Sequence, residues 1–271
     1  MMLDADTIRE PIGDSSRARL TALEVFPEIE STNSYLLQQD APPAGCFRVA
    51  LADHQTAGRG RMANRWYSAP RSGICLSLAY TFAEPPGNPA ALTLAAGVAV
   101  VLALESLGLR GAGLKWPNDI IVSDGKLGGM LTEVHPGSDA VSTVVIGIGI
   151  NVDLRQAHEI ATLTTGIGRV SDLATNMPQL PSRAVISAAL IEHVFNALVR
   201  YERRGLAGFL PEWSRLDWLR GQHVTVEESK GRFAGTCEGI DIDGALLVRS
   251  GTDRRRVISG VVRPGFAPGV Q

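Results

Sequence analysis

The pattern of apolar residues changes near residue 219, and this change constrains the fold more than any other feature. After it come short apolar segments separated by turns that contain glycine or aspartate: HVTVEES, RFAGTCEGIDIDG, ALLVRS and RRRVISGVV. Short strands at such close spacing are typical of a small β-barrel. The sequence therefore predicts two units, with a β-barrel over residues 220–271.

The segment before the boundary combines helices and strands. Between residues 181 and 205, apolar residues recur near the 3.6-residue period of a helix, and residues 88–108 predict a second one. Strand-like runs surround these helices without regular strand–helix alternation, which favours an α+β fold with a mixed β-sheet and flanking helices. We expect this main domain over residues 26–219, after a polar tail at residues 1–25.

Composition narrows the function. The chain has 271 residues, 45% of them hydrophobic, and a net charge of −2, so nothing in its charge suggests a general nucleic-acid binder. Cys46, Cys75 and Cys237 show no C-x-x-C spacing, which indicates neither a disulfide framework nor a zinc site. The start lacks the apolar run of a signal peptide, and the apolar segment at residues 90–108 is too interrupted to span a membrane. We expect a soluble, cytoplasmic protein.

The stretch Gly58-Arg59-Gly60-Arg61 is the first candidate site. It fits the G-x-G-x-x-A form of a dinucleotide-binding fingerprint, but no helix is predicted after it, as that motif requires. Glycines let the backbone approach a ligand, and arginine donates several hydrogen bonds to phosphate or carboxylate. The stretch is interpreted either as a flexible anion-binding loop or as a solvated turn with surface arginines.

Two further clusters follow in predicted strands, GLKWPNDIIV, KLGGMLTEV and STVVIGIGINV. Lys115, Asn118, Asp119 and Lys126 surround one predicted hairpin, and lysines beside an aspartate suit a magnesium-assisted phosphate site. Gly147 and Gly149 lie two residues apart on one face of a strand, where missing side chains leave room for a flat ligand. Each cluster alone is equally compatible with an ordinary turn or with tight strand packing.

Taken together, five motifs resemble a known family. STNSYL, HQTAGRGR…RW, KWPND, GKLGGML and GIGINV occur in the order and spacing of the biotin–protein ligases, between Ser31 and Val152. The resemblance implies a catalytic domain related to class II aminoacyl-tRNA synthetases and lipoate ligases, with an SH3-like C-terminal domain. It also implies a two-step reaction. ATP and biotin give biotinyl-5′-adenylate and pyrophosphate, and a lysine of a biotin carboxyl carrier domain then takes biotin and releases AMP.

The resemblance also assigns residues, motif by motif. Lys126, Arg61 and Lys115 would be catalytic, and Asp119 would bind Mg²⁺ that enters with ATP. The other residues that would contact biotin are Ser31, Thr32, Asn33, Gln55, Gly58, Arg59, Gly60, Gly129, Gly147 and Gly149, together with Arg61 and Lys126. The residues that would contact ATP are Arg61, Trp66, Lys115, Asn118, Asp119, Lys126 and Asn151.

Within these assignments, Ser31, Thr32 and Gln55 would hydrogen-bond the ureido group of biotin. Arg59 would close over it, and Asn118 and Asn151 would contact adenine. The acceptor would be the carrier domain of acetyl-CoA carboxylase, or of another acyl-CoA or pyruvate carboxylase. The protein would be a monomer or a weak homodimer, without DNA or membrane as partners. About 30 residues precede STN, so a monofunctional ligase without an N-terminal DNA-binding domain is expected.

The chain departs from the family pattern in the arginine-rich loop. Family members commonly have Arg-x-Gly-Arg after the second glycine, where this chain has Arg61-Met62-Ala63-Asn64. The loss of an arginine at position 64 puts ATP affinity in question, unless Arg65 substitutes for it. The alternatives are a lipoate–protein ligase, an inactive biotin-binding or carrier-docking module, and a Rossmann-type oxidoreductase that would bind NADH.

Overall fold

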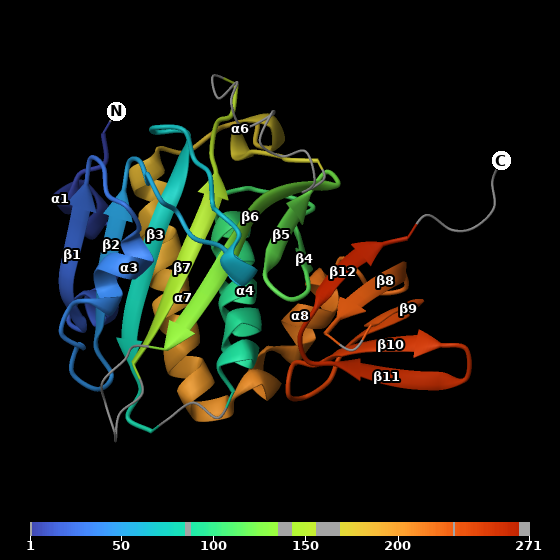
Figure 1. Ribbon diagram of the computed structural model, residues 1–271. Coiled ribbons are helices and arrows are strands. Elements are labelled where there is room, and N and C mark those ends of the chain that lie inside the picture. Colours follow the sequence, from blue (N-terminus) through green and yellow to red (C-terminus); the bar gives the residue numbers. More distant parts are fainter. Residues whose placement is uncertain (1, 85–87, 135–142, 156–168, 230, 266–271) are drawn as a thin grey trace.

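A computed structural model describes residues 2–84, 88–134, 143–155, 169–229 and 231–265. Its main domain is built on a seven-stranded sheet in the order β1-β2-β3-β7-β6-β5-β4, in which only the β1–β2 pair is parallel. This confirms the predicted mixed sheet (Figure 1). The strands are β1 (Leu20–Phe26), β2 (Phe47–Ala52), β3 (Gly73–Thr81), β4 (Gly113–Lys115), β5 (Asp119–Val122), β6 (Gly125–Val134) and β7 (Thr143–Asn151).

One face of the sheet is covered by two long helices, α4 (Pro89–Ser106) and α7 (Arg183–Arg204). Alternate residues of β3 and β7, such as Leu76 and Ile148, are buried on this face because side chains alternate along a strand. Helix α7 begins at the capping residue Ser182, whose side chain accepts from Val185 N. Figure 1 shows α4 and α7 side by side behind the sheet.

By length and composition, α7 is apolar enough to cross a membrane. Its contacts are those of a core helix, since it packs against α4 and β3 and 56% of its most apolar window is buried. A buried helix in a protein core passes the same compositional test, so this feature is weak support for a membrane span.

The opposite face of the sheet is only partly covered. Helix α3 (Thr32–Leu37) contacts β2, β3 and β7 there, and Leu36 packs in a small cluster with Ala79 and Val145. The neighbouring positions on the same face are small or polar, namely Cys75 and Ser77, which pair with glycines of β7. This open part of the sheet is the floor of the site described below.

Residues 1–25 were expected to form a polar tail, but most of this segment belongs to the main domain. It contains α1 (Ala5–Arg9), α2 (Asp14–Arg17) and most of β1. Leu3, Ile8 and Ile12 are buried, and both helices contact α7. The widely spaced apolar residues in an otherwise charged segment concealed this packing.

The C-terminal strands form a separate antiparallel sheet in the order β11-β10-β9-β8-β12. The segment between the two sheets has a 3₁₀ turn, η2 (Leu206–Phe209), and helix α8 (Leu210–Leu216). Hydrogen bonds join the units: Trp116 Nε1 donates to Gly244 O at 3.0 Å, and Asn88 Nδ2 donates to Asp243 O at 2.8 Å. The C-terminal strands are β8 (His223–Glu228), β9 (Gly231–Ile240), β10 (Leu246–Ser250), β11 (Asp253–Val257) and β12 (Val261–Pro264).

One predicted strand is wrong. The run GLKWPNDIIV forms two antiparallel strands, β4 and β5, because Pro117 has no N–H to donate to a sheet ladder. Lys115 therefore pairs directly with Asp119. Between β7 and α7 the chain has a short helix, α6 (Leu173–Asn176); residues 156–168 lie outside the described residues.

Candidate active site

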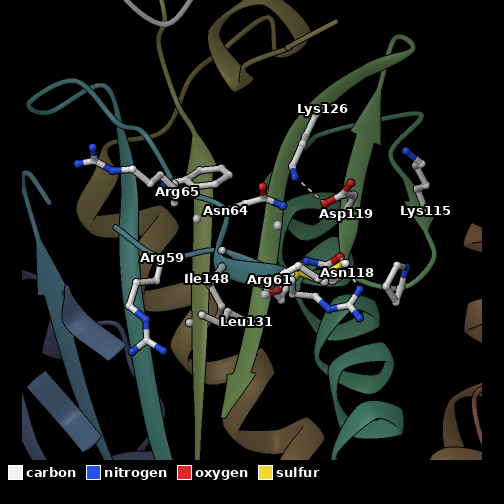
Figure 2. A pocket seen from close by; sticks show the side chains of 18 of the residues that line it. Arg59, Arg61, Asn64, Arg65, Lys115, Asn118, Asp119, Lys126, Leu131 and Ile148 are labelled. Carbon is white, nitrogen blue, oxygen red and sulfur yellow. Dashed lines mark hydrogen bonds and ion pairs between the residues drawn. The ribbon is translucent and has the colours of Figure 1, made fainter. Parts of the chain in front are cut away.

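A cavity of about 830 Å³ lies on the open face of the sheet. Its walls come from β3, β6 and β7, the arginine-rich loop at residues 58–67, the β4–β5 hairpin, and β12 of the C-terminal sheet. Figure 2 shows its cationic part, where Arg61, Lys115 and Lys126 gather around Asp119. Among the lining residues, seven are lysine or arginine and two are aspartate, so the cavity favours an anionic ligand.

The uncharged end of the cavity is a chain of buried polar side chains. Thr32 N and Oγ1 lie 2.8 and 3.0 Å from Gln55 Oε1, and Thr32 Oγ1 lies 2.7 Å from Ser77 Oγ. Ser77 Oγ donates to Asn33 Oδ1 at 2.5 Å. Ser31 caps α3 by accepting from Ser34 N. These side chains are held rigidly and can recognise a polar, uncharged group.

Gly147 and Gly149 were expected to leave room for a flat ligand, but the protein fills both spaces itself. A Cβ on Gly147 would lie 2.9 Å from Asn33 Cγ, and one on Gly149 would lie 2.6 Å from Trp66 Cζ2. The missing side chains therefore admit the Asn33 amide and the Trp66 ring. Both glycines line the cavity, but they shape it through these two residues.

The arginine-rich loop is folded back on itself. Trp66 N donates to Gly58 O at 2.9 Å, and Gly60 N donates to Asn64 O at 2.7 Å. At its tip lies the 3₁₀ turn η1 (Arg61–Ala63), where Met62 has a positive φ of 54° and is 69% exposed. A Cβ added at Gly58 would lie 2.5 Å from Trp66 O, so only glycine fits there.

Arg59 and Arg61, the two loop arginines predicted to be functional, point in different directions (Figure 2). Arg59 pairs with Glu133, and its Nη1 donates to Ser34 Oγ at 3.1 Å. Arg61 Nη1 lies 3.5 Å from Asn118 Oδ1, at the cationic end. Burial lowers the pKa of Arg61, which Asp119 opposes.

Arg65 does not replace the cation that is missing at position 64. Its Nη2 donates to Thr56 O at 3.0 Å, and its guanidinium lies 5.2 Å from the centre of the Tyr67 ring. Figure 2 shows it extending away from the Lys126–Asp119 pair. Asn64 itself lines the cavity and carries no charge.

The cationic end is organised around Asp119. Lys126 Nζ lies 2.6 Å from Asp119 Oδ1, and both side chains are about one-fifth exposed, at 22% and 21%. Burial lowers the pKa of Lys115, an effect that Asp119 opposes and that Lys126 and Arg263 reinforce. Asp119 thus pairs with Lys126 and lies opposite Lys115 in the hairpin, and the excess positive charge suits phosphate groups.

Asn118 and Asn151 use their amide nitrogens within the protein. Asn118 Nδ2 donates to Met130 O at 2.8 Å, while Asn151 Nδ2 contacts Lys126 O at 3.3 Å and Ser171 O at 3.1 Å. Both residues line the cavity. Their predicted contact with adenine stays a prediction, and it would have to use groups other than these donors.

A magnesium ion can be accommodated only with help from its substrate. No group of three or more His, Cys, Asp or Glu residues that could hold a metal occurs in the described part of the chain. Mg²⁺ is commonly held by one or two carboxylates together with substrate phosphates. Asp119, beside the lysines, fits that arrangement.

Comparison with known proteins identifies the family. Residues 25–151 match the Biotin/lipoate A/B protein ligase family, and residues 220–262 match the Biotin protein ligase C terminal domain. The chain is similar to the biotin–[acetyl-CoA-carboxylase] ligase of Mycobacterium tuberculosis, with 32% identity over 268 residues, 92% of this chain and 94% of that protein. The chain belongs to the biotin protein ligase family.

Other relatives agree. The bifunctional ligase/repressor BirA of Escherichia coli is 30% identical over 243 residues, covering 90% of this chain and 71% of that protein. A biotin protein ligase from Aquifex aeolicus in complex with biotin and ATP has a TM-score of 0.74 at 23% identity, covering 91% of this chain and 99% of that chain. At this identity, the likeness to the solved structure establishes the ligase fold, with its SH3-like C-terminal domain, and confirms the predicted fold class.

This biotin protein ligase brings nearly all of its predicted site residues to one cavity. Gly58 lies beside the cavity, under Trp66, and the other predicted residues line the cavity directly. Sequence reasoning missed Ser77 and Glu133, which hold Asn33, and it missed Trp218 and Arg263 from the C-terminal part of the wall. The serine inside the apolar run ICLSLAYTF was the one signal that could have revealed Ser77.

Proposed function

We propose that this chain is an ATP-dependent ligase that activates biotin as biotinyl-5′-adenylate and transfers it to a lysine of a biotin carboxyl carrier domain. The observation that carries the proposal is a single cavity with a polar, uncharged end at Thr32, Gln55 and Ser77 and a cationic end at Lys115 and Lys126. A ligand with a polar head and a carboxylate tail fits this order, and ATP fits beside the tail. Family membership and the names of the relatives support the same reaction.

In the first step, the carboxylate of biotin attacks the α-phosphorus of ATP, and the bond to pyrophosphate breaks. Lys126 and Arg61 would bring the two anions together and stabilise the charge that develops on the phosphate oxygens. Lys115 would hold the departing phosphates. When Mg²⁺ is bound with ATP, it supplies further positive charge to those oxygens, and Asp119 would hold it.

In the second step, the neutral amine of the carrier lysine attacks the acyl carbon of the adenylate, and AMP leaves. No protein nucleophile is needed in either step, because the mixed anhydride is already activated. Arg59 and the loop at residues 58–66 would hold the adenylate until the carrier arrives. The Arg59–Glu133 pair and the Arg59–Ser34 hydrogen bond support this role, since they anchor the loop across the cavity.

Several finer points complete the proposal. The acceptor would be the carrier domain of an acyl-CoA or pyruvate carboxylase, and acetyl-CoA carboxylase is favoured by the name of the Mycobacterium tuberculosis relative. A cytoplasmic location is supported by three free cysteines, Cys46, Cys75 and Cys237. We also propose that the catalytic domain ends near residue 219, where the connection to β8 begins, and that the protein is a monomer or a weak homodimer.

The deciding experiment incubates the protein with MgATP, a carrier domain and either biotin or lipoate. We expect biotin-dependent ATP–pyrophosphate exchange and a biotinylated carrier on a streptavidin blot. Exchange with lipoate alone would instead identify a lipoate ligase. Biotin binding by calorimetry without exchange would identify a binding module.

A further inference from the structure

The polar end of the cavity continues behind the cavity wall to an ion pair. Glu133 Oε2 accepts from Asn33 Nδ2 at 2.9 Å, and the same carboxylate pairs with Arg59. Asn33 then connects through Ser77 to Thr32. Glu133 does not line the cavity, whereas Thr32, Asn33 and Ser77 do. Any effect of Glu133 on a ligand must therefore pass along this chain of side chains.

The orientation of the Asn33 amide is fixed by its neighbours. A carboxylate that pairs with arginine accepts hydrogen bonds and cannot donate them, and the same is true of a backbone carbonyl. Asn33 Nδ2 faces both kinds of acceptor, Glu133 Oε2 and, at 3.4 Å, Leu131 O. The amide oxygen must then face Ser77, and Gly147 provides the space for it.

This orientation determines where each hydroxyl proton goes. A hydroxyl group has one proton to donate and two lone pairs that accept. Ser77 gives its proton to Asn33 Oδ1, so its contact with Thr32 must be one in which Thr32 donates. The single proton of Thr32 Oγ1 is thereby committed to Ser77 Oγ at 2.7 Å in preference to Gln55 Oε1 at 3.0 Å, and Gln55 Oε1 keeps the backbone N–H of Thr32 as its donor. Toward the cavity, the Thr32 oxygen can only accept.

We propose that Glu133 is a positioning residue that sets the direction of this hydrogen-bond chain and makes Thr32 an obligatory acceptor toward the substrate. The site then selects a ligand whose polar head presents an N–H group at this point and rejects one that presents an oxygen. The inference rests on the proposed function, because the ureido ring of biotin carries such N–H groups. It explains why a charged residue outside the cavity is joined to the recognition end.

The test uses two cyclic carbamate analogues of biotin, each with one ureido N–H replaced by oxygen. Calorimetry with the full-length protein compares the Kd of each analogue with that of biotin. For one analogue we expect binding roughly tenfold weaker than biotin, because two acceptors then face each other. In Glu133→Gln the amide can donate to Asn33, so Asn33 can turn and release the proton of Thr32. In this variant we expect the ratio of the Kd of that analogue to the Kd of biotin to fall to about twofold or less.

Three variants separate this effect from general damage. Glu133→Asp keeps an acceptor-only group and should retain the discrimination of the wild type. Ser34→Ala removes the other partner of Arg59 and leaves the hydrogen-bond chain intact, so it should weaken the binding of biotin and of the analogue by the same factor. Ser77→Ala removes the acceptor that holds the Thr32 proton and should reduce the ratio as Glu133→Gln does, which keeps the test decisive if Glu133→Gln does not fold.

Two results would overturn the inference. The first is a folded Glu133→Gln variant whose ratio of analogue Kd to biotin Kd equals that of the wild type. Where that variant does not fold, the same result in Ser77→Ala overturns the inference. The second is a wild-type protein that binds both carbamates as tightly as biotin. A wild-type protein that does not bind biotin at all would refute the proposed function itself, and this inference with it, so the two failures are distinguishable.

Discussion

Replacing Gly149 by alanine tests how the sheet positions the arginine-rich loop. The new Cβ would lie 2.6 Å from Cζ2 and 2.9 Å from Cδ2 of Trp66, so it would press on the face of the indole ring. Ordinary contact begins at 3.4 Å, so the ring must retreat by about 1 Å. Trp66 N is hydrogen-bonded to Gly58 O at 2.9 Å, and the retreat therefore displaces the loop.

The cost divides between stability and catalysis. Overpacking of this kind typically costs about 1–3 kcal/mol of unfolding free energy. The loop is the more yielding side, because Gly149 lies in a strand paired on both edges, with Cys75 and Gly129. A displacement of about 1 Å in an active site can lower the rate by roughly 10²-fold. We therefore expect adenylation to fall by about two orders of magnitude, with a smaller loss of stability.

The assay is ATP–pyrophosphate exchange with biotin, paired with urea unfolding. Gly13→Ala is the matched control, because its new Cβ would make only an ordinary 3.4 Å contact with the flexible Glu192 side chain. Combining Gly149→Ala with Trp66→Phe should relieve the contact, and the two changes should couple by about 0.5–3 kcal/mol. Wild-type exchange by Gly149→Ala, or strictly additive stability losses, would refute the argument.

Four other substitutions address the charges. Lys126→Ala should lower the rate of adenylation by about 10²–10³ in the exchange assay while the protein stays folded, since the lysine supplies charge where it develops; a wild-type rate would remove Lys126 from the mechanism. Burial lowers the pKa of Lys115 below its ordinary 10.5, so between the two values the unfolded chain binds more protons and stability rises with pH; Lys115→Met should abolish that rise in urea unfolding. Arg183→Met should lower the free energy of unfolding in urea by about 3–5 kcal/mol, because it removes the ion-pair partner of Asp53, which is 6% exposed and 2.5 Å from the guanidinium; adding Asp53→Leu should recover most of the loss. Asn64→Arg should lower the KM for ATP by roughly twofold to fivefold at unchanged kcat, and the gain should disappear at high salt.

The strongly patterned parts of the sequence predicted their structures well. The periodic segment at residues 181–205 contains α7, and the strand-like runs around the motifs form β3, β6 and β7. The site motifs also converge on one cavity, because neighbouring antiparallel strands place Gly129, Gly149 and Cys75 in register. These features depend on local periodicity and on motif order, which a single sequence displays directly.

The features that the sequence did not reveal depend on contacts between distant residues. Asn33 and Glu133 are 100 residues apart, and neither the position nor the type of Glu133 marks it as part of a recognition site. The burial of Ile8 and Ile12 on α7 is similarly non-local. The space at Gly147 could be predicted, but not its occupant, because an absent side chain indicates room without indicating what fills it.

Asn64 stands where family members commonly have arginine, and its effect depends on where the other cations of the cavity lie. Lys115 and Lys126 belong to β4 and β6, and Arg263 reaches the cavity wall from β12. Side chains on paired strands are held more rigidly than those of a loop whose tip, Met62, is largely exposed. A rigid cation stabilises developing charge without the reorganisation that a loop residue requires. The cations that strands carry at this end of the cavity are thus Lys115, Lys126 and Arg263, and the loop adds Arg61, whose Nη1 lies 3.5 Å from Asn118 Oδ1.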